Sequence, residues 1–299
     1  MSETAFYTGI CNIVMQDTGG RGLAARLPQP DLAGLRQELA RAQRVLLLTG
    51  FPVLCSGGCV CGETDGPSGI AALAHALLAC RRQVMTVTDA LAAPQLRAAL
   101  HATAPGAGLH VLHGGEAEAE ALLARFQPTH FITLERPGPA ADGHYHNMRG
   151  GVIDAYVADT APLYRLARAR GVVTVAVGDG GNELGMGGFR QQVEAGVPGG
   201  GAICAVDDAD WALAAGVSNW WGWGLSALLS LDAGQLLLPT PASERRLLRA
   251  MHEAHAADGC TGHYALSVDG LPLSLHLEVL QQLRRLTAAA LYEVQHGAG

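Results

Sequence analysis

The chain has 299 residues, a formal net charge of −7 and no basic cluster. This charge argues against a nucleic-acid partner, because binding a phosphate backbone needs a positive footprint. Apolar residues make up 49% of the chain but aromatic residues only 5%, so the core must consist mainly of Ala, Leu and Val, as suits helices packed on a sheet. The sequence shows neither an export-signal pattern nor a run of about 18 apolar residues, and its seven cysteines form no disulfide framework. We therefore expect a soluble, cytoplasmic protein with no membrane partner and a small ligand.

Short apolar strands alternate with helices over the first two thirds of the chain. Strands are predicted at 45–50, 83–88, 109–112, 130–134 and 172–177, and helices at 67–82, 94–103, 117–126 and 162–170. This alternation predicts a mostly parallel sheet with right-handed crossovers and helices on both faces, a Rossmann-like three-layer α/β sandwich. Further helices are predicted at 219–231, 242–257 and 274–293. We expect a helical C-terminal portion within one domain over residues 1–299, loose ends at 1–4 and 295–299, and a mobile loop at 197–201.

Ligands of parallel α/β proteins bind at the carboxyl ends of the strands, and four loops there have unusual polar sequences. The first places Glu63, Thr64 and Asp65 just ahead of a helix, a pattern that also fits an ordinary helix cap. The second contributes Asp89, which alone is equally consistent with a cap. A functional role for either loop is therefore supported only by the loops that are expected to lie beside it.

The third loop, residues 135–150, is longer than compact domains keep without a use. Its arginines can bind a carboxylate in bidentate fashion, its acids can act as bases or metal ligands, and its asparagine can orient a ligand. The alternative is that the arginines only neutralise nearby acids. The residues concerned are Glu135, Arg136, Asp142, Asn147 and Arg149.

The fourth loop, Gly178-Asp-Gly-Gly-Asn-Glu-Leu-Gly185, is the most informative segment. Clustered glycines allow positive φ angles and form a nest of amides for an anion, while Asp179, Asn182 and Glu183 suit a hard cation or proton transfer. The segment is neither a Walker loop nor a dinucleotide fingerprint. A phosphoryl-transfer function therefore has little support.

Two other features leave alternatives open. Cys55, Cys59 and Cys61 could bind a soft metal, but no second cysteine pair with zinc spacing follows, so we expect free thiols that folding does not require. The tryptophan-rich segment 219–223 more simply packs a helix start against the sheet than stacks on a ligand. Asn219, at its start, can cap that helix or contact a ligand.

Taken together, these segments resemble the D-glutamate cyclase-like C-terminal domain family. The matching stretches are 49–53, 63–67, 87–89, 135–138, 142–143, 147–150, 178–187, 218–220 and 267–272. The resemblance implies a lyase that closes D-glutamate to 5-oxo-D-proline and water. In longer eukaryotic members this part is C-terminal to a hydro-lyase-like part that has no counterpart in these residues. The cysteine cluster departs from the Gly/Pro-rich loop expected of the family.

The implied reaction leads to a hypothesis for each loop. An arginine holds the α-carboxylate, a carboxylate takes a proton from the ammonium, and the amine attacks the γ-carboxyl; amides or a divalent cation stabilise the oxyanion. Candidate catalytic residues are Glu135, Asp142, Asp179 and Glu183. Candidate substrate-binding residues are Thr64, Asp65, Gly66, Arg136, Asn147, Arg149, Gly180, Gly181, Asn182 and Asn219. Candidate ligands of Mg²⁺ or Mn²⁺ are Asp65, Asp89 and Asp179.

A non-catalytic sensor of a small anionic metabolite is the alternative from another class, because fold alone does not decide function. The partner expected in both cases is a small acidic amino acid or related anion, and a homo-oligomer is compatible with the sequence. We predict that one cleft at the carboxyl edge of the sheet gathers the side chains of Glu63, Asp65, Glu135, Arg136, Asp179 and Glu183.

Overall fold

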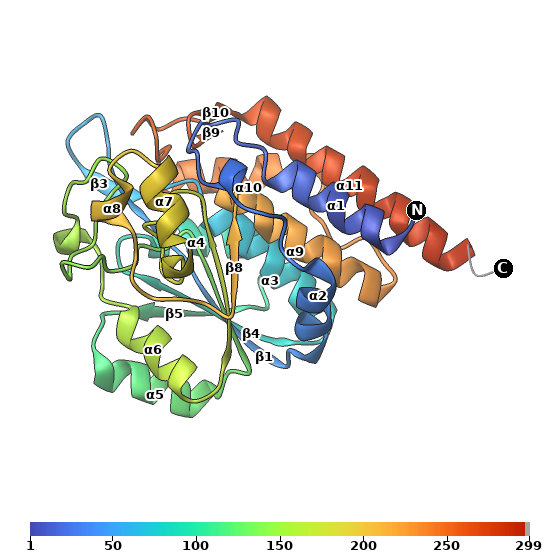
Figure 1. Cartoon of the computed structure of the whole chain (residues 1–299), viewed down its shortest axis with the longest axis horizontal. Coiled ribbons are helices and arrows are strands. Elements are labelled where there is room, and N and C mark those ends of the chain that lie inside the picture. Colours follow the sequence, from blue (N-terminus) through green and yellow to red (C-terminus); the bar gives the residue numbers. More distant parts are fainter. Residues whose placement is uncertain (297–299) are drawn as a thin grey trace.

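The structure, a computed structural model, describes residues 1–296 and is built around a sheet of six parallel strands (Figure 1). In spatial order the strands are β5 (Gly108–Leu112), β4 (Gln83–Asp89), β1 (Arg44–Leu48), β6 (His130–Leu134), β7 (Val173–Gly178) and β8 (Trp211–Ala214). In the register, Val45 lies beside both Val84 and His130. The predicted α/β class and its five strands are confirmed, and β8 is an additional edge strand.

The strand order reverses between β1 and β6. The chain proceeds from β1 through β4 to β5 at one edge, then returns to β6 and continues to β8 at the other. The loops that leave β1 and β6 therefore diverge at their carboxyl ends. Such a switch point is where open α/β sheets bind ligands.

Two layers of helices cover the two faces of the sheet. Along β1, Val45 and Leu47 pack into the larger layer, whereas Leu46 and Leu48 pack into the smaller one, as alternation along a strand requires. The smaller layer contains α5 (Glu116–Phe126) and α6 (Ala161–Ala169). The larger layer contains α1 (Glu3–Val14), α2 (Leu32–Arg41), α3 (Pro67–Ala79), α4 (Ala93–Thr103), α9 (Ser218–Ala233), α10 (Pro241–Glu253) and α11 (Leu273–His296).

Helix α9 is the centre of the larger layer. It is buried on all sides from Ser218 to Leu231, as expected for a helix that is apolar around its circumference. A side chain at Gly222 would lie 2.3 Å from the carbonyl oxygen of Gly69, so glycine is what lets α9 approach α3 closely. The predicted packing role of its tryptophans is confirmed, since Trp221 donates from Nε1 to the carbonyl of Ala214 at 2.8 Å.

The N-terminal helices were not predicted. Residues Phe6, Ile10 and Val14 form the buried stripe of α1, which lies beside α11 in Figure 1. The Ser2 side chain caps this helix by accepting from the N–H of Ala5 at 3.2 Å. Glu3 and Thr4 therefore lie in the first turn of α1, with Ser2 as its cap, where the sequence predicted a loose start, and mobility there stays a prediction.

Other boundaries differ for identifiable reasons. Helix α10 ends at Glu253 rather than at residue 257 because the chain turns through His255, at φ 61°, and Ala257 bridges to Glu63. Residues 197–199 connect α7 (Arg190–Gly196) to α8 (Gly200–Ile203), and residues 200 and 201 begin α8, whereas the sequence predicted a mobile loop over 197–201. Mobility there stays a prediction. Helix α11 continues to His296, so the predicted loose tail falls partly within a helix and otherwise, at 297–299, outside the described residues.

The remaining elements are β2 (Pro52–Leu54), β3 (Val60–Gly62), β9 (Ser267–Val268), β10 (Leu271–Pro272), α7 (Arg190–Gly196), α8 (Gly200–Ile203) and the short 3-10 helices η1 (Ala24–Arg26), η2 (Asp154–Tyr156) and η3 (Gly187–Phe189).

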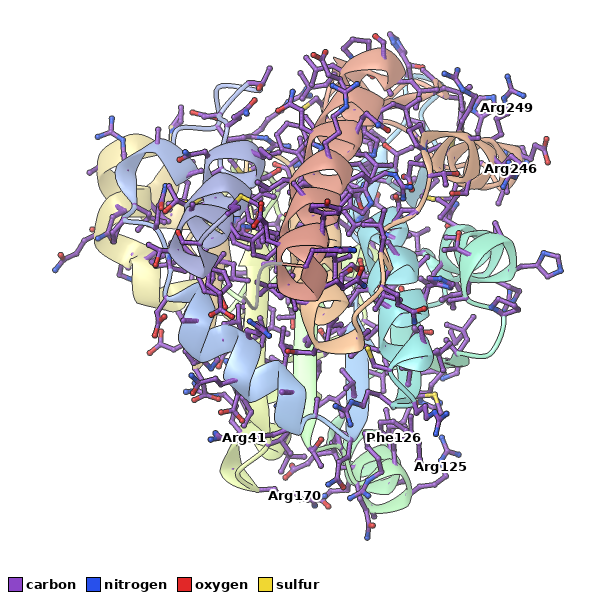
Figure 2. The ribbon with its side chains drawn as sticks, turned by 90° about the vertical axis from the view of Figure 1, so that its right-hand side faces the viewer. Arg41, Arg125, Phe126, Arg170, Arg246 and Arg249 are labelled. Atoms are coloured by element: carbon purple, nitrogen blue, oxygen red, sulfur yellow. The ribbon has the colours of Figure 1, made fainter. Side chains whose placement is uncertain are left out.

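The arginines labelled on the surface in Figure 2 are spread over the molecule rather than gathered in one patch. Figure 2 shows Arg41 and Arg170 near one end of the molecule and Arg246 near the other. Arg41 pairs with Glu38 at 3.0 Å, which offsets its charge. No helix within residues 1–296 combines the length and apolarity needed to cross a membrane. The predictions of a single domain, of a cytoplasmic location and of no nucleic-acid partner stay predictions.

Candidate functional site

Three carboxylates from different loops meet at the switch point. Asp65 precedes α3, Glu135 follows β6 and Asp179 follows β7, and each offers an oxygen within 4.8 Å of the other two. All three side chains are buried. The sheet topology thus places loops that are distant in sequence in one cluster.

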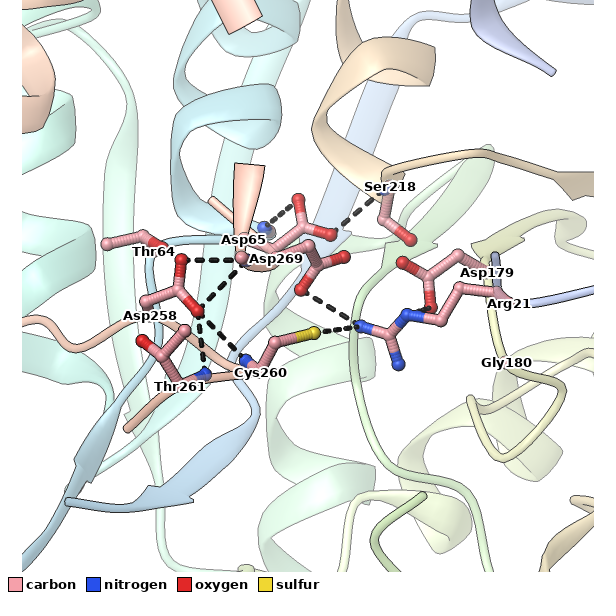
Figure 3. A network of polar contacts seen from close by, with 12 residues as sticks. Arg21, Thr64, Asp65, Asp179, Gly180, Ser218, Asp258, Cys260, Thr261 and Asp269 are labelled. Carbon is pink, nitrogen blue, oxygen red and sulfur yellow. Dashed lines mark hydrogen bonds and ion pairs between the residues drawn. The ribbon is translucent and has the colours of Figure 1, made fainter. Parts of the chain in front are cut away.

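Two further acids and one arginine complete this cluster. Glu63 and Asp269 are buried beside it. Arg21 lies 3.0 Å from Asp269 through Nη2 and 3.6 Å from Asp179 through Nε (Figure 3). The segment that carries Arg21 is shaped by Asp17, whose carboxylate accepts from the N–H groups of residues 21 and 22 at 2.7 and 2.9 Å. We use the name acid cluster for Glu63, Asp65, Glu135, Asp179 and Asp269.

Burial dominates the electrostatics of the acid cluster. It raises the pKa of Glu63, Asp65, Glu135 and Asp179 well above the ordinary carboxyl range. Neighbouring carboxylates raise the pKa values further, whereas Arg21 lowers that of Asp179 without outweighing burial. The site therefore favours protonated acids or a bound cation over a set of bare charges.

Several oxygens of the acid cluster lack a donor. Both carboxylate oxygens of Asp179, Oε2 of Glu135 and Oε1 of Glu63 are buried and accept no hydrogen bond within residues 1–296. Buried acceptors without partners cost free energy, about 1–3 kcal/mol each. Oxygen ligands of this kind are what Mg²⁺ and Mn²⁺ prefer, so Asp65, Glu135 and Asp179 fit a divalent cation.

Asp65 also has a structural role. It accepts from the N–H groups of Gly66, Ser218 and Asn219 at 3.0, 2.9 and 2.8 Å, which joins the starts of α3 and α9. A carboxylate has about four lone-pair sites, so three such bonds leave room for one more contact.

Asn219 and Thr64 hold the same junction rather than reaching into a cavity. The Asn219 side chain accepts from Gly66 and Gly69 and donates to the carbonyl of Thr64 at 3.1 Å. The Thr64 hydroxyl donates to the carbonyl of Ser267 at 2.8 Å. The predicted substrate-binding role of Thr64, Gly66 and Asn219 therefore becomes one of loop support.

Arg136 does not enter the acid cluster, which corrects its predicted role. Its fully buried guanidinium pairs with Asp89 at 2.6 Å and donates to Gly50, Ala158 and Thr160. These bonds engage four of its five N–H groups, so it is not free to bind a substrate carboxylate. The same ion pair engages Asp89, a predicted metal ligand, so that Asp65 and Asp179 are grouped with Glu135 rather than with Asp89.

Glu183 fills the amide nest that was predicted for an oxyanion. Its carboxylate accepts from the N–H groups of Asp179, Gly180 and Gly181 at 2.9, 2.8 and 2.7 Å. Gly180 and Gly181 therefore have no free amide for a substrate, and Glu183 is not free to act as a base. Its role is to fix the loop that presents Asp179.

Asp142 lies outside the acid cluster, which corrects its predicted catalytic role. It is exposed and pairs with His146 at 3.0 Å. Hydrogen bonds, first from the backbone of His144 and then from His146, lower the pKa of Asp142. These contacts shape the long loop and leave the carboxylate away from the buried acids.

Glu63 and Glu135 of the acid cluster line a cavity of about 250 Å³, whereas Asp65, Asp179 and Asp269 are not among its lining residues. This volume is below the about 300–1,000 Å³ of pockets for drug-sized ligands, so a small metabolite fits better. A larger hollow of about 490 Å³ lies at the other end of β7, beside Arg168 and Asp210, and has no acid cluster. The polar residues that line the smaller cavity are Arg21, Glu63, Glu135, Asn147, Arg149, Asn182, Cys260 and Thr261.

Three of the predicted substrate-binding residues line the cavity. Arg149 is exposed and donates to the carbonyl of Cys260 at 3.3 Å. Asn182 donates to the carbonyl of His146 at 2.8 Å, and Asn147 accepts from the N–H groups of residues 149 and 151. The structure thus keeps Asn147, Arg149 and Asn182 at the site.

Sequence reasoning missed Arg21 and Asp269 because neither follows a strand of the sheet. A signal was present in the glycine-rich stretch around Arg21, Thr18-Gly-Gly-Arg-Gly22, and in the Ser-Val-Asp-Gly turn at 267–270. Asp269 has a φ of 54°, which marks a turn held in an unusual conformation.

Comparison with known proteins identifies the family of the chain. Residues 10–284 match the family model described as D-glutamate cyclase-like, C-terminal. The human protein named D-glutamate cyclase, mitochondrial, is 31% identical over 314 aligned positions, which cover 91% of this chain and 50% of that protein. The chain therefore spans about half the length of this relative.

Proposed function

Because the chain belongs to the D-glutamate cyclase-like, C-terminal family, we propose that it is a hydro-lyase that closes D-glutamate, or a closely related acidic amino acid, to 5-oxoproline and water. The observation that carries the proposal is one small cavity lined by two arginines and by Glu63 and Glu135, each of which has a buried carboxyl oxygen without a partner in the described residues. The carboxyls suit proton transfer to a leaving oxygen, and the arginines suit substrate carboxylates.

Arg149 and Arg21 are the groups proposed to hold the substrate. Arg149 lies exposed on the cavity lining, where it can meet the α-carboxylate. Arg21 uses Nε and Nη2 for Asp179 and Asp269, while within the described residues its Nη1 makes no hydrogen bond (Figure 3). Nη1 can therefore donate to a second carboxylate, and a diacid would be gripped at both ends.

The acid cluster is proposed to move the protons. Ring closure takes two protons from the ammonium and releases one γ-carboxyl oxygen, and the two protons and that oxygen leave together as water. A bare carboxylate of Asp179 can accept a proton from the ammonium, while a protonated Glu63, which lines the cavity, can donate one to the leaving oxygen. Burial raises the pKa of Glu63 and keeps such an acid protonated near neutral pH. Holding amine and carboxyl together supplies much of the remaining acceleration, because the reaction is intramolecular.

We propose that Asp65, Glu135 and Asp179 hold Mg²⁺ or Mn²⁺. When bound, the cation would polarise the γ-carboxyl and offset the charge of the acids. The residues themselves would then fix its position, because Asp65 is tied to two helix starts and the Asp179 loop is fixed by Glu183.

A direct assay tests the proposal. The purified chain is incubated with D- or L-glutamate, with EDTA or with Mn²⁺, and 5-oxoproline is measured by chromatography. We expect product from D-glutamate with Mn²⁺, a loss of about 100-fold or more in Asp179→Asn, and no change in Asp142→Asn, whose carboxylate lies outside the cavity. Binding of glutamate without any product would support the sensor instead.

A further inference from the structure

The hairpin beside the cavity carries three thiols. Strands β2 and β3 pair in antiparallel fashion, with Val53 opposite Cys61. The sulfurs of Cys55 and Cys61 lie 3.0 Å apart, and both side chains are buried, at 3% and 7% exposure. Cys59, at the turn, is exposed. We use the name thiol hairpin for residues 52–62.

We propose that Cys55, Cys59 and Cys61 form a peroxide-reactive site that ends as a Cys55–Cys61 disulfide beside the cavity. The proposal does not depend on the cyclase reaction. It rests on the grouping of an exposed thiol with two buried ones that already face each other.

Cys59 is placed to react first. Its sulfur lies 3.0 Å from the hydroxyl of Tyr264, and this hydrogen bond, followed by one from Cys55, lowers the pKa of the Cys59 thiol. Burial, by contrast, raises the pKa of Cys61 to about 12. The thiolate is the reactive form, so oxidation begins at the exposed turn rather than at the buried pair.

Cys55 is placed to react second. The turn holds it against Cys59, because the N–H of Cys55 donates to the carbonyl of Cys59 at 2.8 Å. Its sulfur also faces Cys61. Cys55 can therefore exchange a bond with Cys59 for one with Cys61 through side-chain rotation.

The steps balance with one hydroperoxide as oxidant. The Cys59 thiolate attacks a peroxide oxygen, the O–O bond breaks, and a sulfenic acid and an alcohol or water form. The Cys55 thiol displaces the hydroxyl as water and forms a disulfide with Cys59. Cys61 then attacks the Cys55 sulfur, which releases the Cys59 thiol. Two thiols have lost two hydrogens, one peroxide has been reduced, and a dithiol reductant reverses the change.

The thiol hairpin is joined to the functional site. Val53 and Leu54 line the cavity, and the N–H of Ser56 donates to the carbonyl of Gly262, another lining residue, at 2.9 Å. Glu63 of the acid cluster follows β3 directly. A disulfide across the hairpin would therefore fix one wall of the cavity.

Differential alkylation of the full chain tests the proposal. The reduced protein is treated with an equimolar amount of hydrogen peroxide, its free thiols are blocked with a light reagent, and its disulfides are reduced and labelled with a heavy one. Tandem mass spectrometry then assigns each cysteine. We expect heavy label on Cys55 and Cys61 and light label on Cys59, with Cys80, which lies at the end of α3, light as an internal control.

Variants sharpen the outcome. Cys59→Ser should slow formation of the Cys55–Cys61 disulfide by about tenfold or more, because the thiol hairpin then keeps only its two buried thiols. Cys61→Ser should stop the series of reactions at a Cys55–Cys59 disulfide. Cys80→Ser should leave both the rate of oxidation and the labelling pattern unchanged. Three outcomes would each overturn the proposal. In the first, Cys55 and Cys61 carry only light label; in the second, Cys59→Ser forms the disulfide at the wild-type rate; in the third, zinc is bound stoichiometrically to these thiols.

Discussion

Glu135→Gln gives the sharpest test of the acid cluster, because it removes a charge while keeping the shape of the side chain. Glu135 is 6% exposed, and its Oε2 has no hydrogen-bond partner in the described residues. Burial raises the pKa of Glu135, and the charges of Glu183 and Asp65 raise it further. We expect the apo variant to be more stable than the wild type and nearly inactive.

The magnitude follows from proton affinity. Each tenfold difference in proton affinity between the folded and unfolded states costs about 1.4 kcal/mol at a pH above both pKa values. Because the ordinary pKa of Glu is about 4.3, this cost is at most about 4 kcal/mol at pH 7, and removing the ionisable group raises the free energy of unfolding by up to that amount. In a chain of this size each kcal/mol moves Tm by about 2–4 °C. Turnover should fall about 100-fold or more, because a proposed ligand of the cation that would polarise the γ-carboxyl is lost.

Thermal unfolding with EDTA and with Mn²⁺ measures both effects. A ligand present at 100 times its Kd stabilises the native state by about 2.7 kcal/mol. We expect the wild type to gain this stability with Mn²⁺ and Glu135→Gln to lose most of the gain. A variant that melts below the wild type in EDTA, yet responds to Mn²⁺ as the wild type does, would refute the reasoning. Asp142→Asn serves as the control, because it removes an exposed carboxylate outside the cavity.

Three other predictions follow from the same contacts. In EDTA, the free energy of unfolding should fall as pH rises from about 5 to 8, because acids whose pKa is raised by folding, such as Glu63, bind more protons in the folded state; melting curves over this range test the sign, and rising stability would contradict it. Asp89→Asn should lower the free energy of unfolding by about 3–5 kcal/mol, since it leaves Arg136 buried without its counter-charge; denaturant unfolding measures this, and a change below about 1 kcal/mol would contradict the assignment. Arg149→Ala should raise KM about tenfold with a smaller change in kcat, because its side chain is exposed and binds rather than reacts; a selective loss of kcat would place it in the chemistry instead.

Much of the fold could be predicted because its signals are local. Buried parallel strands appear as short apolar runs, so β6 was predicted with its observed bounds, 130–134. The edge strand β8 is the short apolar run Trp-Ala-Leu-Ala, whose alanines suit a helix as well as a strand, so pattern alone does not assign it. Helix α10 was predicted too long because Ala256 and Ala257 continue its apolar pattern. In the structure both pack in apolar clusters outside the helix, and Ala257 forms a bridge with Glu63. Such tertiary contacts have no signature in local sequence.

The site was predictable in its loops but not in its side-chain directions. Strand-end position alone indicated Asp65, Glu135 and Asp179, and topology brings them together. Arg136 is adjacent to Glu135 yet points to Asp89, a choice that depends on packing. Arg21 reaches the site from a segment that lies outside the sheet, so no pattern of strands and loops indicates it.

Labelled substrate tests the central claim most directly. The chain with Mn²⁺ is given D-glutamate that carries a heavy oxygen isotope at both positions of the γ-carboxyl, and the 5-oxoproline formed is analysed by mass spectrometry beside a sample without protein. The account predicts product that retains one of the two labelled oxygens, the other leaving as water, at a rate that Asp179→Asn reduces about 100-fold or more. If D-glutamate binds but product forms no faster than without protein, the chain is not a cyclase and the acid cluster serves binding alone.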